Sequence, residues 1–203
     1  MSGTRSGVVS SYRPRAGDAL VLVDIQNDFL PGGALAVPRG NEVIEPLNRS
    51  IREFERYRLP IFATRDWHPG NHCSFRAQGG PWPPHCIARS QGAQFAAQLQ
   101  LVPDVRIISK ATRADADAYS GFQDTDLAQQ LRDLGCTRLF IGGLAADYCV
   151  RATALDALTA GFEVVVLADA IRAVDVRPGD GERALQEITA QGAQVVATQQ
   201  VLL

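Results

Sequence analysis

The sequence predicts a single α/β domain built on a doubly wound, mostly parallel sheet of six strands, with helices on both faces of the sheet. Short, uninterrupted apolar runs are typical of strands buried on both faces, and they occur at residues 19–23, 60–64, 105–109, 138–141, 163–168 and 193–197. Amphipathic stretches typical of helices lie between several of them, at residues 42–56, 125–134, 147–160 and 180–191. Because strand and helix alternate, we expect ligands to bind at the carboxyl ends of the strands.

The length of the chain limits the number of domains. With 203 residues, of which 46% are hydrophobic, the chain can bury one substantial core. Residues 1–17 contain Ser, Gly and Arg but no apolar stretch of the kind found in secretory signals, so we expect a flexible N-terminal tail there. Residues 18–203 then form the single domain.

Composition also bears on partners and location. The 20 basic and 22 acidic side chains nearly cancel, which argues against binding to nucleic acid or to an anionic membrane surface. No apolar run approaches the roughly 20 residues needed to span a bilayer. The four cysteines form no CxxC pair and are expected to be reduced. We therefore expect a cytoplasmic protein with a small-molecule partner, and a homo-oligomer remains open.

A long connection separates the second and third expected strands. Residues 65–104 are about forty residues where a helix and short loops normally suffice, and a short helix is expected near residues 93–99. All three histidines of the chain, His68, His72 and His85, lie in this connection, and Asp66 precedes them. Imidazole nitrogens with one carboxylate suit Zn²⁺, Fe²⁺ or Mn²⁺ and leave positions for water or substrate.

Two other interpretations of these histidines are open. They can be ordinary surface side chains, because their spacing matches no compact metal-finger pattern. Alternatively, the His72-Cys73 and His85-Cys86 pairs can form a closed structural Cys₂His₂ zinc site, although adjacent side chains in a loop rarely both face one ion.

Three residues that could carry chemistry follow expected strands. Asp24 follows residues 19–23, Lys110 follows residues 105–109, and Cys149 lies at the start of the expected helix 147–160. A carboxylate screened by apolar strands can have a raised pKa and move protons. A thiol at the positive end of a helix is favoured as thiolate, and a nearby ammonium adds to this. Gly142 and Gly143 permit a tight backbone that turns NH groups toward an oxyanion.

Each of these residues also has a structural interpretation. Asp24 can cap a turn, Cys149 can be a buried core cysteine, and Lys110 can be an exposed lysine. Cys136, at the end of an expected helix, is interpreted as a core residue.

Taken together, residues 17–203 resemble the nicotinamidase (pyrazinamidase) branch of the isochorismatase-like hydrolases. The resemblance is carried by the following segments in order: VDIQNDF at 23–29, PGGALAV at 31–37, DWHP at 66–69 with His72, WPPHC at 82–86, Lys110, YSGF at 119–122, and GLAADYCV at 143–150.

The resemblance implies roles for individual residues. It implies a catalytic triad of Asp24, Lys110 and Cys149, with an oxyanion hole formed at Ala145 and Cys149 after a cis peptide between residues 144 and 145. The further implied sets are the metal ligands Asp66, His68, His72 and His85, and the aromatic substrate-binding residues Phe29, Trp82 and Tyr119.

The expected function is metal-dependent hydrolysis of nicotinamide to nicotinic acid and ammonia through a Cys149 thioester in NAD salvage, with Zn²⁺ as the first expected ion; whether pyrazinamide is also a substrate is open. The alternatives are a related amidohydrolase acting on a ureide, carbamoyl compound or isochorismate, and a non-catalytic metal-binding or partner-binding module on the same fold. The sequence departs from the family pattern at Ala146, where threonine is common, at Ala111, where glycine is usual, and in the length of residues 111–118. These departures bear on the shape of the pocket and leave the reacting groups in place.

Overall fold

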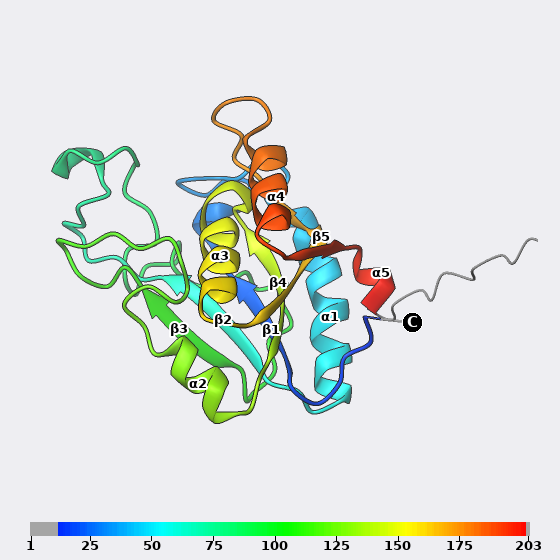
Figure 1. The fold of residues 1–203 in the computed structure, drawn as a ribbon. Helices are drawn as coiled ribbons and strands as arrows, with labels where there is room; N and C mark the ends of the chain where they lie inside the picture. Colours follow the sequence, from blue (N-terminus) through cyan, green and yellow to red (C-terminus); the bar gives the residue numbers. More distant parts are fainter. Residues whose placement is uncertain (1–11, 202–203) are drawn as a thin grey trace, which may run out of the picture.

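The computed structural model describes residues 12–201, and within them six strands form one parallel sheet (Figure 1). The strands are β1 (Asp18–Val23), β2 (Ile61–Asp66), β3 (Arg106–Lys110), β4 (Arg138–Leu144), β5 (Glu163–Arg172) and β6 (Gln194–Val196). Their order is β3-β2-β1-β4-β5-β6, and each neighbouring pair is parallel. The expected fold class is confirmed.

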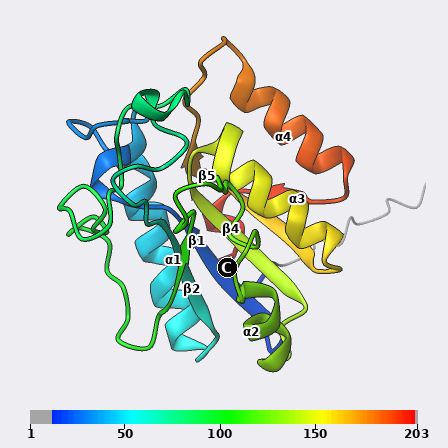
Figure 2. The ribbon, with the colours of Figure 1, turned by 90° about the vertical axis from the view of Figure 1, so that its left-hand side faces the viewer.

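Helices cover both faces of the sheet, as Figure 2 shows. One face carries α1 (Ile44–Arg56) and α5 (Thr198–Val201), and the other carries α2 (Leu127–Asp133), α3 (Arg151–Thr159) and α4 (Asp180–Ala190). Leu47, Ile51 and Phe54 recur at helical spacing, so one side of α1 packs into the core. The remaining short helical turns are η1 (Asn27–Phe29), η2 (Gly40–Val43), η3 (Arg76–Gln78) and the π-helical turn η4 (Ala146–Val150).

The strand order determines where a ligand can bind. The chain builds the sheet outward from β1 toward β3, then returns to the other side of β1 and builds from β4 toward β6. The connections that leave β1 and β4 therefore diverge at the carboxyl ends of these two central strands. Doubly wound sheets bind their ligands in the crevice at this reversal point.

The connection between β2 and β3 is the long one expected from the sequence. In Figure 1, the first part of this connection extends beyond the carboxyl ends of the strands, which are the arrowheads. The prediction of a short helix within residues 93–99 is wrong, because these residues form turns instead. Their backbone pairs with the chain after β1: Gln94 accepts from the amide of Asn27, and the amide of Ala96 donates to Ile25. These bonds occupy backbone NH and CO groups that would otherwise pair within a helix.

Residues 1–11 of the expected tail lie outside the described part of the chain. Of the remaining six tail residues, Tyr12 packs against the core and Pro14 is buried. Among residues 12–201, no helix has the length and apolar character needed to cross a membrane.

Candidate active site

The ends of three strands bring the reacting groups together. Asp24 directly follows β1, Lys110 is the last residue of β3, and Cys149 lies in the π-helical turn that follows β4. The Lys110 Nζ atom lies 3.0 Å from Asp24 Oδ2 and 3.5 Å from Cys149 Sγ. All three side chains are buried. The structure therefore brings together the acid, amine and sulfur that the sequence placed at the same edge of the sheet.

Asp24 is held as a buried carboxylate. Burial raises the pKa of Asp24, and the Lys110 ammonium and the Thr64 hydroxyl act in the opposite direction. Thr64 Oγ1 donates to Asp24 Oδ1 at 2.6 Å, so this oxygen is satisfied while Oδ2 faces Lys110. The backbone of Asp24 has φ of 53°, a left-handed conformation that is uncommon outside glycine and concentrates at functional sites. A carboxylate with a raised pKa is a better base than an ordinary aspartate.

The surroundings of Cys149 disfavour the thiolate, which is opposite to the direction expected from the helix end. Burial raises the pKa of the Cys149 thiol well above its usual range; Lys110 lowers it, while Asp24 and Asp66 raise it further. Burial and the two carboxylates together outweigh the effect of the Lys110 ammonium. A nucleophilic role for this thiol therefore requires a base at hand, and Asp24 provides one.

A second cluster adjoins the first. One ligand atom from each of Asp66, His68 and His85 lies within 4.8 Å of the others, and all three side chains are buried. His68 Nδ1 faces the carbonyl of Ala111 at 3.2 Å, and His85 Nδ1 faces the carbonyl of Pro83 at 2.8 Å. A ring nitrogen facing a carbonyl oxygen must donate, so in each ring the Nε2 atom keeps its lone pair.

These free lone pairs satisfy a test for a bound metal ion. Within the described residues His68 Nε2 is buried and has no hydrogen-bond partner, an expensive arrangement unless a ligand fills it. Burial lowers the pKa of His85, which keeps its imidazole neutral as a ligand must be. A ligand histidine that donates its other NH to a carbonyl is the usual arrangement around metals. Asp66, His68 and His85 therefore fit a divalent ion.

The structure does not bring His72 into this cluster, although its ring lies only 4.2 Å from that of His68, centroid to centroid. His72 Nε2 faces the carbonyl of Ala116 at 3.1 Å and must donate to it. Its Nδ1 then accepts from the Ser74 hydroxyl at 2.8 Å. Both nitrogens are engaged, so His72 has no lone pair for an ion in this arrangement.

Asp66 belongs to both clusters. Its Oδ1 accepts from Lys110, and its Oδ2 lies 3.6 Å from His68 Nε2. Burial opposes ionisation of Asp66, but the Lys110 ammonium outweighs it and holds the pKa of Asp66 well below its usual range. Gln26 fixes the backbone of Asp66 on both sides: its Nε2 donates to the carbonyl, and its Oε1 accepts from the amide, both at 2.8 Å.

The Cys₂His₂ alternative does not match the geometry. Neither Cys73 nor Cys86 belongs to a potential metal-binding group among the described residues. Cys86 is fully buried, and burial strongly raises the pKa of its thiol, whereas a zinc site needs thiolates. Cys136 is buried in the core, as expected.

A narrow cavity of ≈ 40 Å³ opens above Cys149. Phe29, Trp82 and Tyr119 line it as expected, and so does Tyr148, which the sequence reasoning did not identify. Trp82 Nε1 donates to the Tyr119 hydroxyl at 2.9 Å, and the Trp82 ring meets that of Tyr148 edge-on with centroids 5.2 Å apart.

Ala145 also lines the cavity, and the peptide bond between Leu144 and Ala145 is cis, as the resemblance implied. Ala111 adopts φ of 50°, which explains why glycine is the usual residue there.

Thr64, Gln26 and Tyr148 are the site residues that sequence reasoning missed. Tyr148 carried a signal, because it directly precedes the expected nucleophile.

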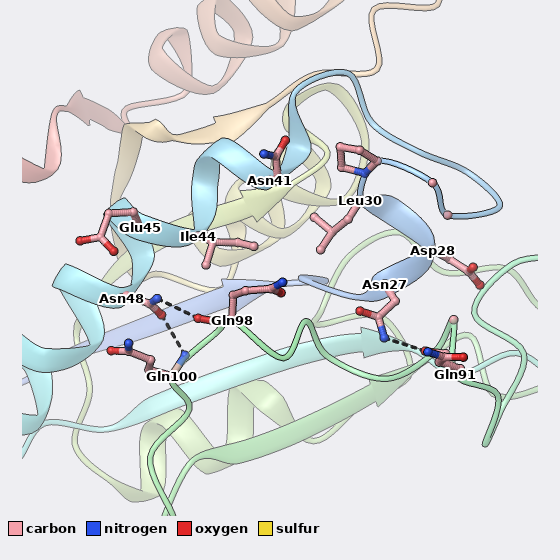
Figure 3. A pocket seen from close by; sticks show the side chains of 14 residues that line it. Asn27, Asp28, Leu30, Asn41, Ile44, Glu45, Asn48, Gln91, Gln98 and Gln100 are labelled. Atoms are coloured by element: carbon pink, nitrogen blue, oxygen red, sulfur yellow. Dashed lines mark hydrogen bonds between the residues drawn. The ribbon is translucent and has the colours of Figure 1, made fainter.

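A more spacious cavity lies elsewhere on the protein. A groove of ≈ 1030 Å³ lies between the turn after β1, the start of α1 and residues 91–100 (Figure 3). Its amide side chains are used for local structure: Asn48 donates to the carbonyl of Gln98 and accepts from the amide of Gln100, and Asn27 donates to the carbonyl of Gln91. None of the reacting groups lines this groove.

Comparison with known proteins gives consistent results. Residues 18–200 match the isochorismatase domain family. The nicotinamidase of Escherichia coli is 39% identical, with 86% of this chain and 92% of that protein covered. The zinc complex of the pyrazinamidase of Pyrococcus horikoshii is 52% identical, covers 89% of this chain and 99% of its own, and has a TM-score of 0.86. A nicotinate complex of a protein from L. infantum is 37% identical, covers 93% and 96%, and has a TM-score of 0.87.

Proposed function

The chain belongs to the isochorismatase domain family, and on this premise we propose that it is an amidohydrolase that converts nicotinamide to nicotinic acid and ammonia, with pyrazinamide as a second substrate. The observation that carries the proposal is the adjacency of the two clusters: the Asp24, Lys110 and Cys149 group adjoins the Asp66, His68 and His85 group through Asp66. Relatives named for nicotinamidase and pyrazinamidase activity support it.

The lining of the cavity combines aromatic and polar side chains. Phe29, Trp82 and Tyr119 offer aromatic surface for a flat ring, and Cys149, His68 and His85 line the same cavity. We expect the carboxamide to face Cys149 and the ring nitrogen to face His68 and His85. A divalent ion, Zn²⁺ as the first candidate, would supply a Lewis acid that anchors a ring nitrogen and polarises a water molecule.

In the first half of the proposed reaction, Asp24 takes the Cys149 proton as the sulfur attacks the amide carbon. The base is necessary because burial keeps the thiol protonated. Lys110 stabilises the negative charge on the sulfur, and the NH groups of Ala145 and Cys149 receive the oxyanion. Asp24 then gives its proton to the departing nitrogen, so a thioester forms and ammonia leaves.

In the second half, Asp24 again acts as a base, now for water. The hydroxide equivalent adds to the thioester carbon, the carbon–sulfur bond breaks, and the proton returns to Cys149. Nicotinic acid leaves, and the enzyme is regenerated with one water consumed for each ammonia released. Alternation between acid and base suits a carboxyl group whose pKa is raised. We place this reaction in NAD salvage in the cytoplasm.

The two other candidate functions lack a supporting observation. A ureide or carbamoyl substrate has no ring nitrogen for the histidine cluster to anchor. A non-catalytic module would not need a buried ammonium beside two carboxylates and a thiol, because taking these charges out of water costs free energy.

Ammonia release by the metal-loaded protein tests the proposal, with nicotinamide and benzamide compared side by side. Benzamide keeps the ring and the carboxamide and lacks only the ring nitrogen, so we expect its kcat/KM to be at least about 100-fold lower. Cys149→Ala is expected to release no ammonia from either amide. Equal turnover of the two amides would contradict the ring-nitrogen anchor, and activity in Cys149→Ala would contradict the covalent route.

A further inference from the structure

A wider apolar chamber continues outward from the catalytic cavity. It has a volume of ≈ 830 Å³ and shares four lining residues with the catalytic cavity, namely Leu35, Trp82, Tyr119 and Tyr148. We call this chamber the vestibule. Because these side chains line both spaces, the vestibule lies directly beside the catalytic cavity.

The outer walls of the vestibule are apolar and come from three segments that are distant in the sequence. Ala34 and Ala36 come from the connection after β1, Pro81 and Pro83 from the long β2–β3 connection, and Val176 from the segment after β5. Val176 is 61% exposed, a large fraction for an aliphatic side chain. Arg76 adds a charged group to this lining. An apolar chamber with some polar groups is typical of a ligand site.

The wall that carries Val176 is fixed by hydrogen bonds. The carboxylate of Asp147 accepts from the backbone amides of Val174 at 3.0 Å and Asp175 at 2.8 Å. The Asp175 side chain in turn accepts from the amide of Gly181 at the start of α4, at 2.8 Å. Asp147 lies two residues before Cys149, so the turn η4, which carries the nucleophile, also fixes the backbone next to Val176 in the vestibule wall.

We propose that the vestibule is a substrate subsite that binds an apolar substituent on the ring of an aromatic carboxamide whose amide carbon lies at Cys149. The inference rests on the proposed amidase function and extends it to a substrate class. The catalytic cavity measures ≈ 40 Å³, whereas the adjoining vestibule measures ≈ 830 Å³ and has apolar lining at Val176, Trp82 and Tyr148, so the vestibule is the space into which a ring substituent would extend.

The test measures kcat and KM of the metal-loaded enzyme for nicotinamide and for its 4-, 5- and 6-propyl derivatives. At least one isomer is expected to bind with a KM about fivefold lower than that of nicotinamide, because its propyl group is partly buried against the vestibule. If nicotinamide is hydrolysed and no propyl isomer is, the vestibule proposal is overturned and the amidase function stands. If no amide is hydrolysed, both are overturned.

The Val176→Asp variant tests whether the lower KM of a propyl isomer arises in the vestibule, because Val176 lines the vestibule and does not line the catalytic cavity. The change is expected to raise KM for the favoured isomer about fivefold and to leave nicotinamide within about twofold. Val195→Asp is the matched control: Val195 is also an exposed valine, 37% exposed, but lies on β6 at the far end of the strand order. Equal effects of the two variants, or equal effects of Val176→Asp on both substrates, would overturn the proposal. The milder Val176→Thr replaces Val176→Asp if the latter lowers the Tm.

Discussion

Replacing Thr64 by valine removes one hydroxyl group and keeps the shape of a fully buried side chain. That hydroxyl donates to Asp24 Oδ1 at 2.6 Å. A hydrogen bond to a buried carboxylate is worth about 1.5–3 kcal/mol, and one pKa unit corresponds to about 1.36 kcal/mol. Loss of the bond should therefore raise the pKa of Asp24 by about one to two units beyond the rise that burial already causes.

The consequence appears in the pH profile of kcat/KM. Only ionised Asp24 can accept the Cys149 proton, so activity falls as the pH falls through the pKa of Asp24 in the free enzyme. A higher pKa in Thr64→Val moves this acid limb to higher pH by about one to two units, and activity on the alkaline side of the limb changes little.

The assay is ammonia release from nicotinamide over the acid to neutral range, for wild type and two variants. Thr198→Val is the matched control, because Thr198 is also fully buried and donates to Asp169 at 2.6 Å, away from the reacting groups. Its acid limb should coincide with that of the wild type. An unshifted acid limb in folded Thr64→Val, or the same shift in both variants, would refute Asp24 as the base.

Three further predictions follow from the geometry. His85→Ala should weaken Zn²⁺ binding by more than about 100-fold, whereas His72→Ala should keep its metal because both nitrogens of His72 are engaged with protein groups; metal analysis after dialysis that shows the reverse order would contradict the ligand set. Iodoacetamide should alkylate Cys149 slowly near pH 7 and faster as the pH rises, since burial raises the pKa of the thiol; a fast rate independent of pH above 6 would show a resting thiolate. Asp147→Ala, which frees the amides of Val174 and its neighbour, should raise KM by about tenfold and lower kcat by less; a loss confined to kcat would place its role in the chemical step.

The sheet could be predicted because strands that are buried on both faces consist mainly of apolar residues. All of β1 is buried between two neighbouring strands, so an unbroken apolar run is sufficient to identify it. Asp24 and Lys110 directly follow such runs and Cys149 begins the helix after another, which made them candidates; the family resemblance assigned their roles. The histidines were found because they gather in one long connection.

The remaining features depend on contacts between distant segments, which no local pattern encodes. Gln26 fixes Asp66 across forty residues, and Thr64 reaches Asp24 across the same separation. The engagement of His72 with the carbonyl of Ala116 spans 44 residues. The expected helix at residues 93–99 failed because the partner of that backbone lies after β1. The raised pKa of Cys149 has a similar origin, since it depends first on burial of the sulfur by distant segments and then on the charges of Lys110, Asp24 and Asp66.

The most direct test of the central claim is to identify the covalent intermediate. Wild-type enzyme is mixed with nicotinamide, quenched in acid within the first turnover, digested and examined by mass spectrometry. The account predicts a nicotinoyl group on the peptide that contains Cys149, formed and lost at rates that match ammonia release, and absent from Asp24→Asn. Ammonia release with no acyl group on that cysteine, or with the acyl group on another residue, would contradict it.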